Sequence, residues 1–314
     1  MKAHFKLGAL AASLVMAACG GGGDSAPAGN GAGTGSGGGG TTQAVSIQFA
    51  AVAGAGNTPV NCSTTLTGIG STPTNATLTD LRFYVTDVKL VTAQGTEVPV
   101  TLTPNNWQQT GASGDVTLID LEDGQFTCGG EGTLETNAVV SGTVPTGTYT
   151  KVRATIGVPE ALSHSDVMAA AAPLDIMAMG WSWQAGRKFI KVEVNPIGGV
   201  STPLGGGGTT SVPTFNLHLA STDCTGPGNG TDTCAKKNLT QLELDFNAST
   251  QQIALDVAAL FAASDIRTNQ SDAVGCMSAT SDLDCPPFFG KLGLDIATGA
   301  QAATAQSVFR VIPK

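Results

Sequence analysis

Short segments in which apolar and polar residues alternate recur along most of the chain, separated by Gly, Asn and Pro residues. Alternation with a period of two is typical of β-strands that bury one face. Leu81, Phe83 and Val85, for example, would point to the same side of an extended segment. The pattern predicts strands at 45–52, 81–91, 97–102, 116–121, 136–144, 149–156, 188–194, 242–246, 252–255 and 307–312, with a hairpin turn at 93–95.

Helical periodicity is sparse and is confined to 257–263 and to a turn or two at 165–171. Many strands at short spacing are typical of an all-β domain. The sequence therefore predicts a mostly β fold: a single antiparallel Greek-key β-sandwich or barrel-like domain with long loops. The Gly-rich stretch 198–210 is predicted to be an exposed loop within it.

The first residues have the layout of an export signal. Lys2 and Lys6 precede a largely apolar run at 7–18, which ends in small residues directly before Cys19. This order is that of a secretory signal, and the cysteine indicates cleavage before Cys19 with lipid attached to its sulfur. We therefore predict that residues 1–18 are a lipoprotein signal peptide. The alternative is an ordinary signal peptide whose cysteine is incidental.

The segment that follows, 19–43, consists almost entirely of Gly, Ser, Ala and Thr. Such a composition cannot bury enough apolar surface to offset the entropy of ordering, so it predicts a disordered, flexible tether. The folded domain is then expected at 44–314. With lipid on Cys19, the chain would be anchored in the cell envelope. Gly20 favours the outer membrane, with the domain facing the periplasm or the cell surface.

The net charge of −9 limits the possible partners. An acidic surface repels phosphate backbones, so nucleic-acid binding is not expected.

Six cysteines remain after Cys19, an even number that indicates three disulfides in an exported chain, although six cysteines allow 15 pairings. Cys224 with Cys234 and Cys276 with Cys285 would each close a short loop, which leaves Cys62 with Cys128. The competing interpretation is a metal site. No Cys-x-x-Cys spacing supports it, and thiols oxidise outside the cell.

Conventional catalytic patterns are missing from the chain. Only His164 and His218 follow the predicted signal peptide, and the Ser165 and Asp166 neighbours of His164 do not make a triad, because chain neighbours rarely face one another correctly. The Gly-rich runs lack a following Lys-Ser/Thr, so they are not phosphate-binding loops. We therefore do not expect an enzyme.

One segment, 177–186, concentrates two of the three tryptophans and two of the six methionines. On an extended chain, Met177, Met179, Trp181 and Trp183 would share one face. Imidazole and thioether groups suit copper, Cu(I) in particular. The competing interpretation is that this face packs in the core and that both histidines are structural.

Short segments along nearly the whole predicted domain match, in the same order, segments of a known protein family. The matching segments are 80–90, 107–108, 118–124, 142–149, 156–159, 162–164, 173–174, 179–186, 188–190, 215–224, 275–278, 282–285 and 292–294. In these segments the chain resembles the MbnP-like family, also called the four-Cys-motif proteins of metallo-mystery pair systems. Members of this family are periplasmic or surface copper-binding proteins.

The resemblance implies a copper site, Cu(I) or Cu(II), built from histidines and a tryptophan oxidised to kynurenine. The oxidising partner would be a diheme enzyme of the MauG or cytochrome c peroxidase type. Carried onto this sequence, the ligand candidates are His164, His218 and Met179, and the candidates for oxidation are Trp181 and Trp183. Gly180 and Arg187 depart from the family pattern, but neither removes a candidate ligand.

Together these observations predict a non-enzymatic, exported copper-binding lipoprotein that captures or stores copper. The alternative is a structural or adhesive surface lipoprotein without a metal site. A copper oxidase is a third possibility, for which two histidines are few.

Overall fold

The computed structural model describes residues 40–130, 132–181, 186–227 and 231–314. The predicted signal peptide, Cys19, most of the predicted tether and Trp183 lie outside these residues. Among the described residues, no helix has both the length and the apolar character needed to cross a membrane.

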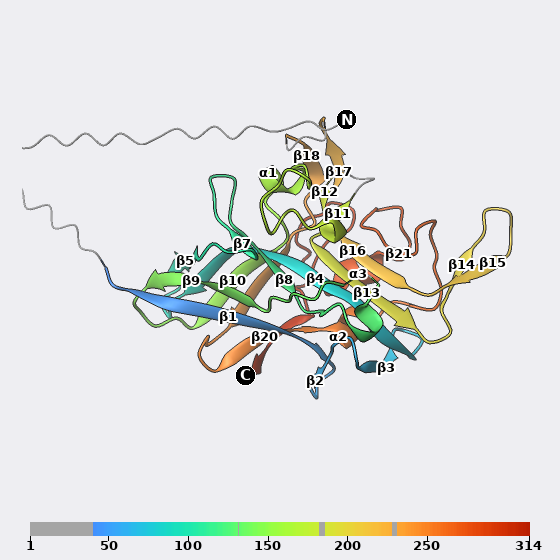
Figure 1. Ribbon diagram of the computed structural model, residues 1–314, viewed down its shortest axis with the longest axis horizontal. Helices are drawn as coiled ribbons and strands as arrows, with labels where there is room; N and C mark the ends of the chain where they lie inside the picture. The colour runs from blue at the N-terminus through green and yellow to red at the C-terminus, as the bar shows by residue number, and fades with distance from the viewer. Residues whose placement is uncertain (1–39, 131, 182–185, 228–230) are drawn as a thin grey trace, which may run out of the picture. The chain divides into compact units, whose positions relative to one another are not determined.

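Two β-sheets form the body of the described part of the chain (Figure 1). In the first, β1 lies between β20 and β9, and β2 pairs with the end of β1. The strands of this sheet are, in spatial order, β22 (Phe309–Pro313), β20 (Gln251–Asp256), β1 (Thr42–Ala53), β9 (Val139–Pro145) and β6 (Thr101–Leu102), with β2 (Thr58–Pro59) beside β1.

The second sheet is organised around the long strand β4 (Thr74–Val91). Along its length β4 pairs with five other strands, so nearly every backbone group of β4 has a partner. The other strands are β3 (Thr65–Ile69), β5 (Glu97–Pro99), β7 (Gln108–Gln109), β8 (Val116–Asp120), β10 (Lys151–Ile156), β13 (Ile190–Pro196), β16 (Phe215–Leu219), β19 (Thr240–Asp245) and β21 (Gly275–Cys276).

The main core lies where the two sheets face each other. Phe83 of β4 makes edge-on contacts with Phe49 of β1 and Phe309 of β22, with ring centroids 5.5 Å and 5.4 Å apart. Leu81 and Val85 belong to the same buried cluster, which confirms that these alternating residues share one side. Each such side chain contributes about 1.5–3 kcal/mol by leaving water. Helices α2 (Val257–Phe261) and α3 (Pro286–Lys291) add Phe261 and Phe288, whose rings contact each other.

The opposite face of the second sheet is buried too, beneath residues 157–181 and 186–189. Tyr84 of β4 packs with Met179 and Phe189 in a second apolar cluster, and its hydroxyl donates to the Pro173 carbonyl at 3.0 Å. The covering segment contains α1 (Glu160–Ser163), the 3-10 helix η2 (Met177–Met179) and the strands β11 (Gly180–Trp181) and β12 (Gly186–Arg187). The candidate site residues therefore lie on a covered face of the sheet.

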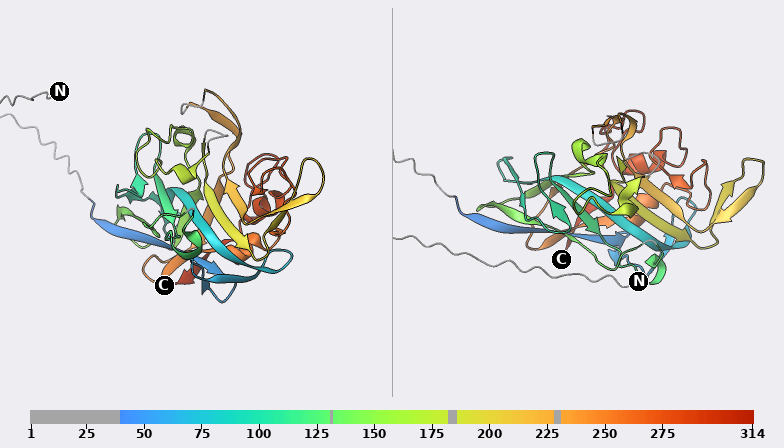
Figure 2. Two further views of the ribbon diagram at one scale, coloured as in Figure 1. Left: turned by 45° about the vertical axis from the view of Figure 1, so that its right-hand side comes forward. Right: turned by 45° about the horizontal axis from the view of Figure 1, so that its top comes forward.

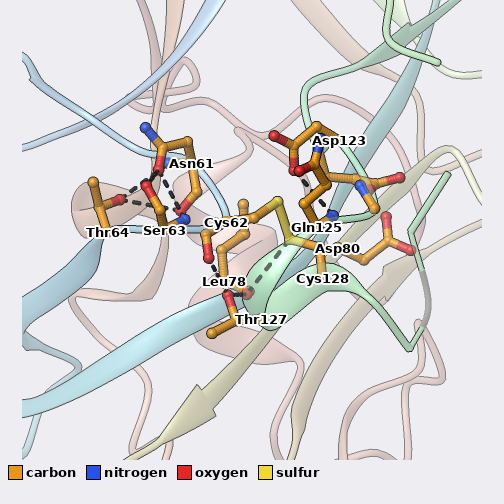
Figure 3. Close-up of a disulfide and its surroundings, with 12 residues drawn as sticks. Asn61, Cys62, Ser63, Thr64, Leu78, Asp80, Asp123, Gln125, Thr127 and Cys128 are labelled. Atoms are coloured by element: carbon orange, nitrogen blue, oxygen red, sulfur yellow. Dashed lines mark hydrogen bonds between the residues drawn. A yellow bond between two sulfur atoms is a disulfide. The ribbon is translucent and has the colours of Figure 1, made fainter. Parts of the chain in front are cut away.

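The three predicted disulfides are all present: Cys62–Cys128, Cys224–Cys234 and Cys276–Cys285. Figure 3 shows the first, which fixes the 3-10 helix η1 (Phe126–Cys128) against β4. There the Thr127 hydroxyl approaches the carbonyl oxygens of Cys62 and Leu78 at 2.6 Å each. The long-range staple is thus reinforced by hydrogen bonds to the strand that it covers.

The mostly β sandwich is confirmed, with four differences from the prediction. The sheets do not close into a barrel in the described residues, and β1–β20 and β16–β21 pair in parallel. The predicted loop 198–210 is largely a hairpin of β14 (Val200–Pro203) and β15 (Thr209–Val212), which extends away from the sheets in Figures 1 and 2. Residues 165–171 form turns, and the helix lies just before them, at α1.

Candidate metal site at the β11–β12 hairpin

The hairpin β11–β12 is the feature that both candidate histidines approach. Its strands are antiparallel, with Trp181 directly opposite Gly186. Directly opposed residues direct their side chains to the same face. Trp181 is only 4% exposed, and Gly186 has no side chain, so the backbone of β12 is open to close approach on this face.

His164 occupies that position. It is buried, and a Cβ added to Gly186 would meet its ring at 3.0 Å from Cε1 and 3.3 Å from Nδ1. Nε2, on another edge of the ring, lies 3.0 Å from the Sγ of Cys234. A disulfide sulfur has no proton to donate, so a hydrogen bond at this contact would run from Nε2–H to the sulfur. Of the two ring nitrogens, Nδ1 is the one nearer to Gly186 of the hairpin.

Arg187 fixes the backbone on both sides of His164. Its guanidinium is buried, and it donates to the carbonyl oxygens of Ser163, Ser165 and Leu174 at 3.3, 2.6 and 3.0 Å. Burial lowers the pKa of Arg187, yet a guanidinium remains charged in proteins. One residue of β12 thus holds the segment that carries His164 against the hairpin.

His218 reaches the same hairpin from β16. Its ring meets Trp181 edge-on, with ring centroids 6.0 Å apart and planes at 90°. Nε2 of His218 lies 2.7 Å from Oε1 of Glu193 on the neighbouring strand β13. His218 is therefore in contact with Trp181 of the hairpin, and its ring is held in place by the carboxylate of Glu193.

The charge states of this pair follow from burial and hydrogen bonding. Burial raises the pKa of Glu193, but hydrogen bonds and charge from His218 and Lys191 outweigh it and lower the pKa to about 2. Burial also lowers the pKa of His218, in spite of the hydrogen bond to Glu193. At neutral pH a neutral imidazole thus donates its Nε2 proton to a carboxylate, and Nδ1 has the lone pair.

The two histidines share one feature of their surroundings. Each is buried and has Nε2–H directed to an acceptor, Cys234 for His164 and Glu193 for His218. Histidines that bind metals in proteins commonly donate their other ring N–H in this way, which fixes the tautomer and orients the ring. Both side chains thus have surroundings that are common among metal-binding histidines.

A row of buried charges leads across the sheet to His218. Asp120 of β8, Arg82 of β4, Lys191 of β13 and His218 of β16 are successive cross-strand partners. Arg82 lies 3.0 Å from Asp120 and also pairs with Glu122, while Lys191 pairs with Asp80 and, at 3.0 Å, with Glu193.

These buried groups contain more carboxylates than cations. Burial raises the pKa of Asp80 to about 6, against the opposing charges of Lys191 and Arg82. Burial likewise raises the pKa of Asp120 to about 7, with Arg82 opposing and Glu122 adding to the effect. Both pKa values show that Arg82 and Lys191 do not fully offset the cost of burying these carboxylates.

The two methionines are separated by the structure. The segment 177–179 is a 3-10 helix rather than a strand, so Met177 is 63% exposed and Met179 is fully buried. The predicted shared face is therefore wrong for this pair. Met179 packs with Tyr84 and Phe189 in the apolar cluster, and no described contact joins it to either histidine. Trp183 lies outside the described residues.

Three contributors to the site had no role in the sequence prediction: Glu193, Arg187 and the sulfur of Cys234. The only sequence feature that pointed to any of these contributors was the charged residue Glu193 within the alternating segment 188–194. Its alternation predicts that Glu193 shares a face with Lys191, but that face would ordinarily be exposed to solvent.

The close fit of Gly186 against His164 leads to a specific expectation. Gly186→Ala places a methyl group 3.0 Å from the imidazole, so the ring must shift by a few tenths of an ångström. We expect weaker Cu(I) binding in a competition titration, with a loss of unfolding free energy no greater than the ~1–3 kcal/mol typical of overpacking. Gly111→Ala is the control, because a Cβ there meets nothing within 4 Å. Equal Cu(I) affinity in the two variants would contradict this placement of His164.

The fold and the site together define a disulfide-stapled β-sandwich with two buried histidines at a tryptophan hairpin. Comparison with known proteins identifies the family: the MbnP family model matches residues 42–278, and the chain belongs to that family. Among solved structures, MbnP from Methylosinus trichosporium is similar, with 33% identity and a TM-score of 0.73. The match covers 87% of this chain and 99% of that one. A search of curated proteins found no match.

Proposed function

We propose that this protein is an exported, non-enzymatic copper-binding lipoprotein that captures or stores copper, with one ion held between His164 and His218. The observation that carries the proposal is the pair of buried imidazoles at one hairpin, each with its Nε2 beside an acceptor. Nitrogen ligands of this kind bind both Cu(I) and Cu(II). Membership of the MbnP family supports copper as the metal.

Each surrounding residue has a defined part in this proposal. Glu193 fixes the orientation of His218, and Arg187 fixes the backbone that carries His164. Lys191 balances the charge of Glu193 through an ion pair at 3.0 Å. The buried surroundings keep water from competing for the metal ion. Met179 is a packing residue in this arrangement rather than a ligand.

Trp181 is the residue that we propose is oxidised to kynurenine by a diheme MauG-type partner. It is already in contact with His218, so the aryl amine formed by opening the indole would add a nitrogen donor beside a proposed ligand. Lipid on Cys19 and the segment 19–43 would attach the domain to the envelope, where such a partner is also located.

The modification is tested by tandem mass spectrometry of the mature chain isolated from cells that contain the diheme partner. We expect kynurenine at Trp181, its loss in Trp181→Phe, and its retention in Trp107→Phe, because Trp107 directly precedes β7 and packs against an apolar cluster to which Trp181 does not belong. Kynurenine at 183 alone would move the assignment to Trp183, and an unmodified chain would reject this part of the proposal.

Copper binding itself is tested by titrating the full chain with Cu(I) against a chromophoric chelator. We expect one ion per chain and an affinity that depends on the histidines. If the chain binds no copper, with or without oxidised tryptophan, the metal site is rejected. The structural or adhesive lipoprotein then becomes the better account.

A further inference from the structure

A second group of metal-ligating atoms lies on the side of His164 away from the hairpin. The Sγ atoms of Cys224 and Cys234 and a ring nitrogen of His164 all lie within 4.8 Å of one another. Cys224 and Cys234 are joined as a disulfide, so they offer no thiolate in this state. Two thiolates and an imidazole at such distances are, however, a ligand set for soft and borderline metal ions.

The two cysteines are held opposite each other by more than their S–S bond. They face each other across the hairpin of β17 (Thr222–Thr225) and β18 (Thr233–Lys236), whose ladder also pairs Thr222 with Lys236. Lys236 forms an ion pair with Asp223 at 2.8 Å. Breaking the disulfide would therefore leave the two sulfurs close together.

His164 is likewise held independently of the disulfide. Arg187 fixes its neighbours, and Glu160 of α1 accepts a hydrogen bond from the backbone N–H of Cys234 at 2.9 Å. That bond connects the helix preceding His164 directly to strand β18. The three ligands would thus stay near one another after reduction.

This disulfide is also the most accessible of the three. Cys62, Cys128, Cys276 and Cys285 are at most 1% exposed, whereas Cys224 is only partly buried. Because thiol–disulfide exchange requires a thiolate to reach a sulfur, a reductant should attack Cys224–Cys234 first.

We propose that the Cys224–Cys234 disulfide is a redox gate, and that its reduction by a dithiol creates a Cys2His site for Cu(I) with His164. In this step the protein S–S bond breaks and an S–S bond forms in the dithiol, which supplies two electrons and two protons. Both protons end on the cysteine thiols and pass to solvent when the thiolates bind the metal ion.

The two sites compete for one side chain. In the oxidised chain, Nε2 of His164 lies beside Cys234 and Nδ1 is the ring nitrogen nearer to Gly186 of the hairpin. A metal ion beside the thiolates would bind His164 through Nε2, the ring nitrogen that faces Cys234. Reduction would thus withdraw His164 from the hairpin site. This competition rests on the proposed function, whereas the Cys2His site itself does not.

The test uses the full chain, reduced with a dithiol and desalted without oxygen, with Cd²⁺ as a soft spectroscopic probe. Alkylation and mass mapping should find two free thiols, at Cys224 and Cys234. We expect one Cd²⁺ per reduced chain with a thiolate charge-transfer absorption. That absorption should be absent from the oxidised chain, from the reduced and alkylated chain, and from the Cys224→Ser/Cys234→Ser variant.

His164→Asn should weaken Cd²⁺ binding to the reduced chain by more than roughly 10-fold. A loss of about that size follows from removing only the hydrogen-bond partner of a ligand, and this variant removes the proposed ligand itself. The Cu(I) affinity of the wild-type chain should rise on reduction. Free thiols at these two cysteines without the absorption, or prior reduction of another disulfide, would overturn the proposal. If the oxidised chain binds no copper but the reduced chain gives the absorption, the proposed function fails and this site stands.

Discussion

Replacing Arg82 with methionine is expected to destabilise the domain by about 3–5 kcal/mol, the cost of removing one partner from a buried ion pair. Arg82 is fully buried between Asp80, Asp120 and Glu122, and methionine fills a similar volume without a charge. The three carboxyl groups would remain in place without their guanidinium. Chemical denaturation of the full chain measures the change in the free energy of unfolding.

The same substitution has a predictable pH dependence. In the wild-type chain, burial raises the pKa of Asp120 from its ordinary value of 3.8 to about 7. Without the opposing charge of Arg82, we expect this pKa to rise further. A carboxyl group whose pKa is higher in the folded state than in the unfolded state lowers the free energy of unfolding once the pH exceeds the unfolded-state pKa. This loss grows with pH until the pH passes the folded-state pKa. The destabilisation should therefore be larger at pH 8 than at pH 5.

Arg153→Met is the matched control for Arg82→Met. Arg153 also pairs with two carboxylates, Glu97 and Glu243, but its side chain is 43% exposed. Exposed ion pairs contribute about 0–1 kcal/mol, so this variant should be nearly as stable as the wild type. Similar losses in the two variants would show that burial of the charged row is not what makes Arg82 important.

Glu193→Gln is expected to lower copper affinity by about 10–100-fold, the usual effect of removing the outer partner of a ligating histidine. The glutamine oxygen can still accept the Nε2 proton of His218, but the negative charge that balances Lys191 and the metal ion is lost. His218→Ala, which removes the ligand itself, should cost more. Cu(I) competition titration measures both.

Glu243→Gln serves as the control for this series, since Glu243 is a half-exposed carboxylate on β19 paired with Arg153 and Lys151. It should leave copper affinity unchanged. If Glu193→Gln has no more effect than Glu243→Gln, the carboxylate does not support a ligand, and the role assigned to Glu193 is wrong.

Alternation of apolar and polar residues was sufficient to locate most strands, because one face of each meets the main core. It was less informative where covering loops bury the other face. Lys191 and Glu193 alternate with valines and would be expected in water, yet both are buried in a group of charged residues that also includes Glu122 from a distant loop. Burial of this kind depends on distant loops, so local pattern does not reveal it.

The Gly-rich stretch 198–210 illustrates a second limit. Its glycines predicted a loop, and they do form the turn, but the residues on either side pair as β14 and β15. At 177–179 the expected two-residue period was replaced by a 3-10 turn, which separates Met177 from Met179. In both places short apolar segments gave too little periodicity to decide between alternatives.

The candidate ligands could be proposed from residue chemistry and family resemblance, but their partners depend on strand register. Glu193 reaches His218 only because β13 and β16 are neighbours with Lys191 opposite His218. Cys234 reaches His164 because the hairpin β17–β18 lies against α1, through Glu160. Such pairings join residues 25 and 70 positions apart in the chain, which no local pattern specifies.

The central claim is that His164 and His218 bind the same copper ion. The most direct measurement is Cu(I) competition titration of the oxidised full chain beside His164→Ala, His218→Ala and the double variant, each checked for folding. A shared ion predicts one copper per chain, a large loss of affinity in each single variant, and little further loss in the double variant. Independent, additive losses, or affinity unchanged in either single variant, would contradict the claim.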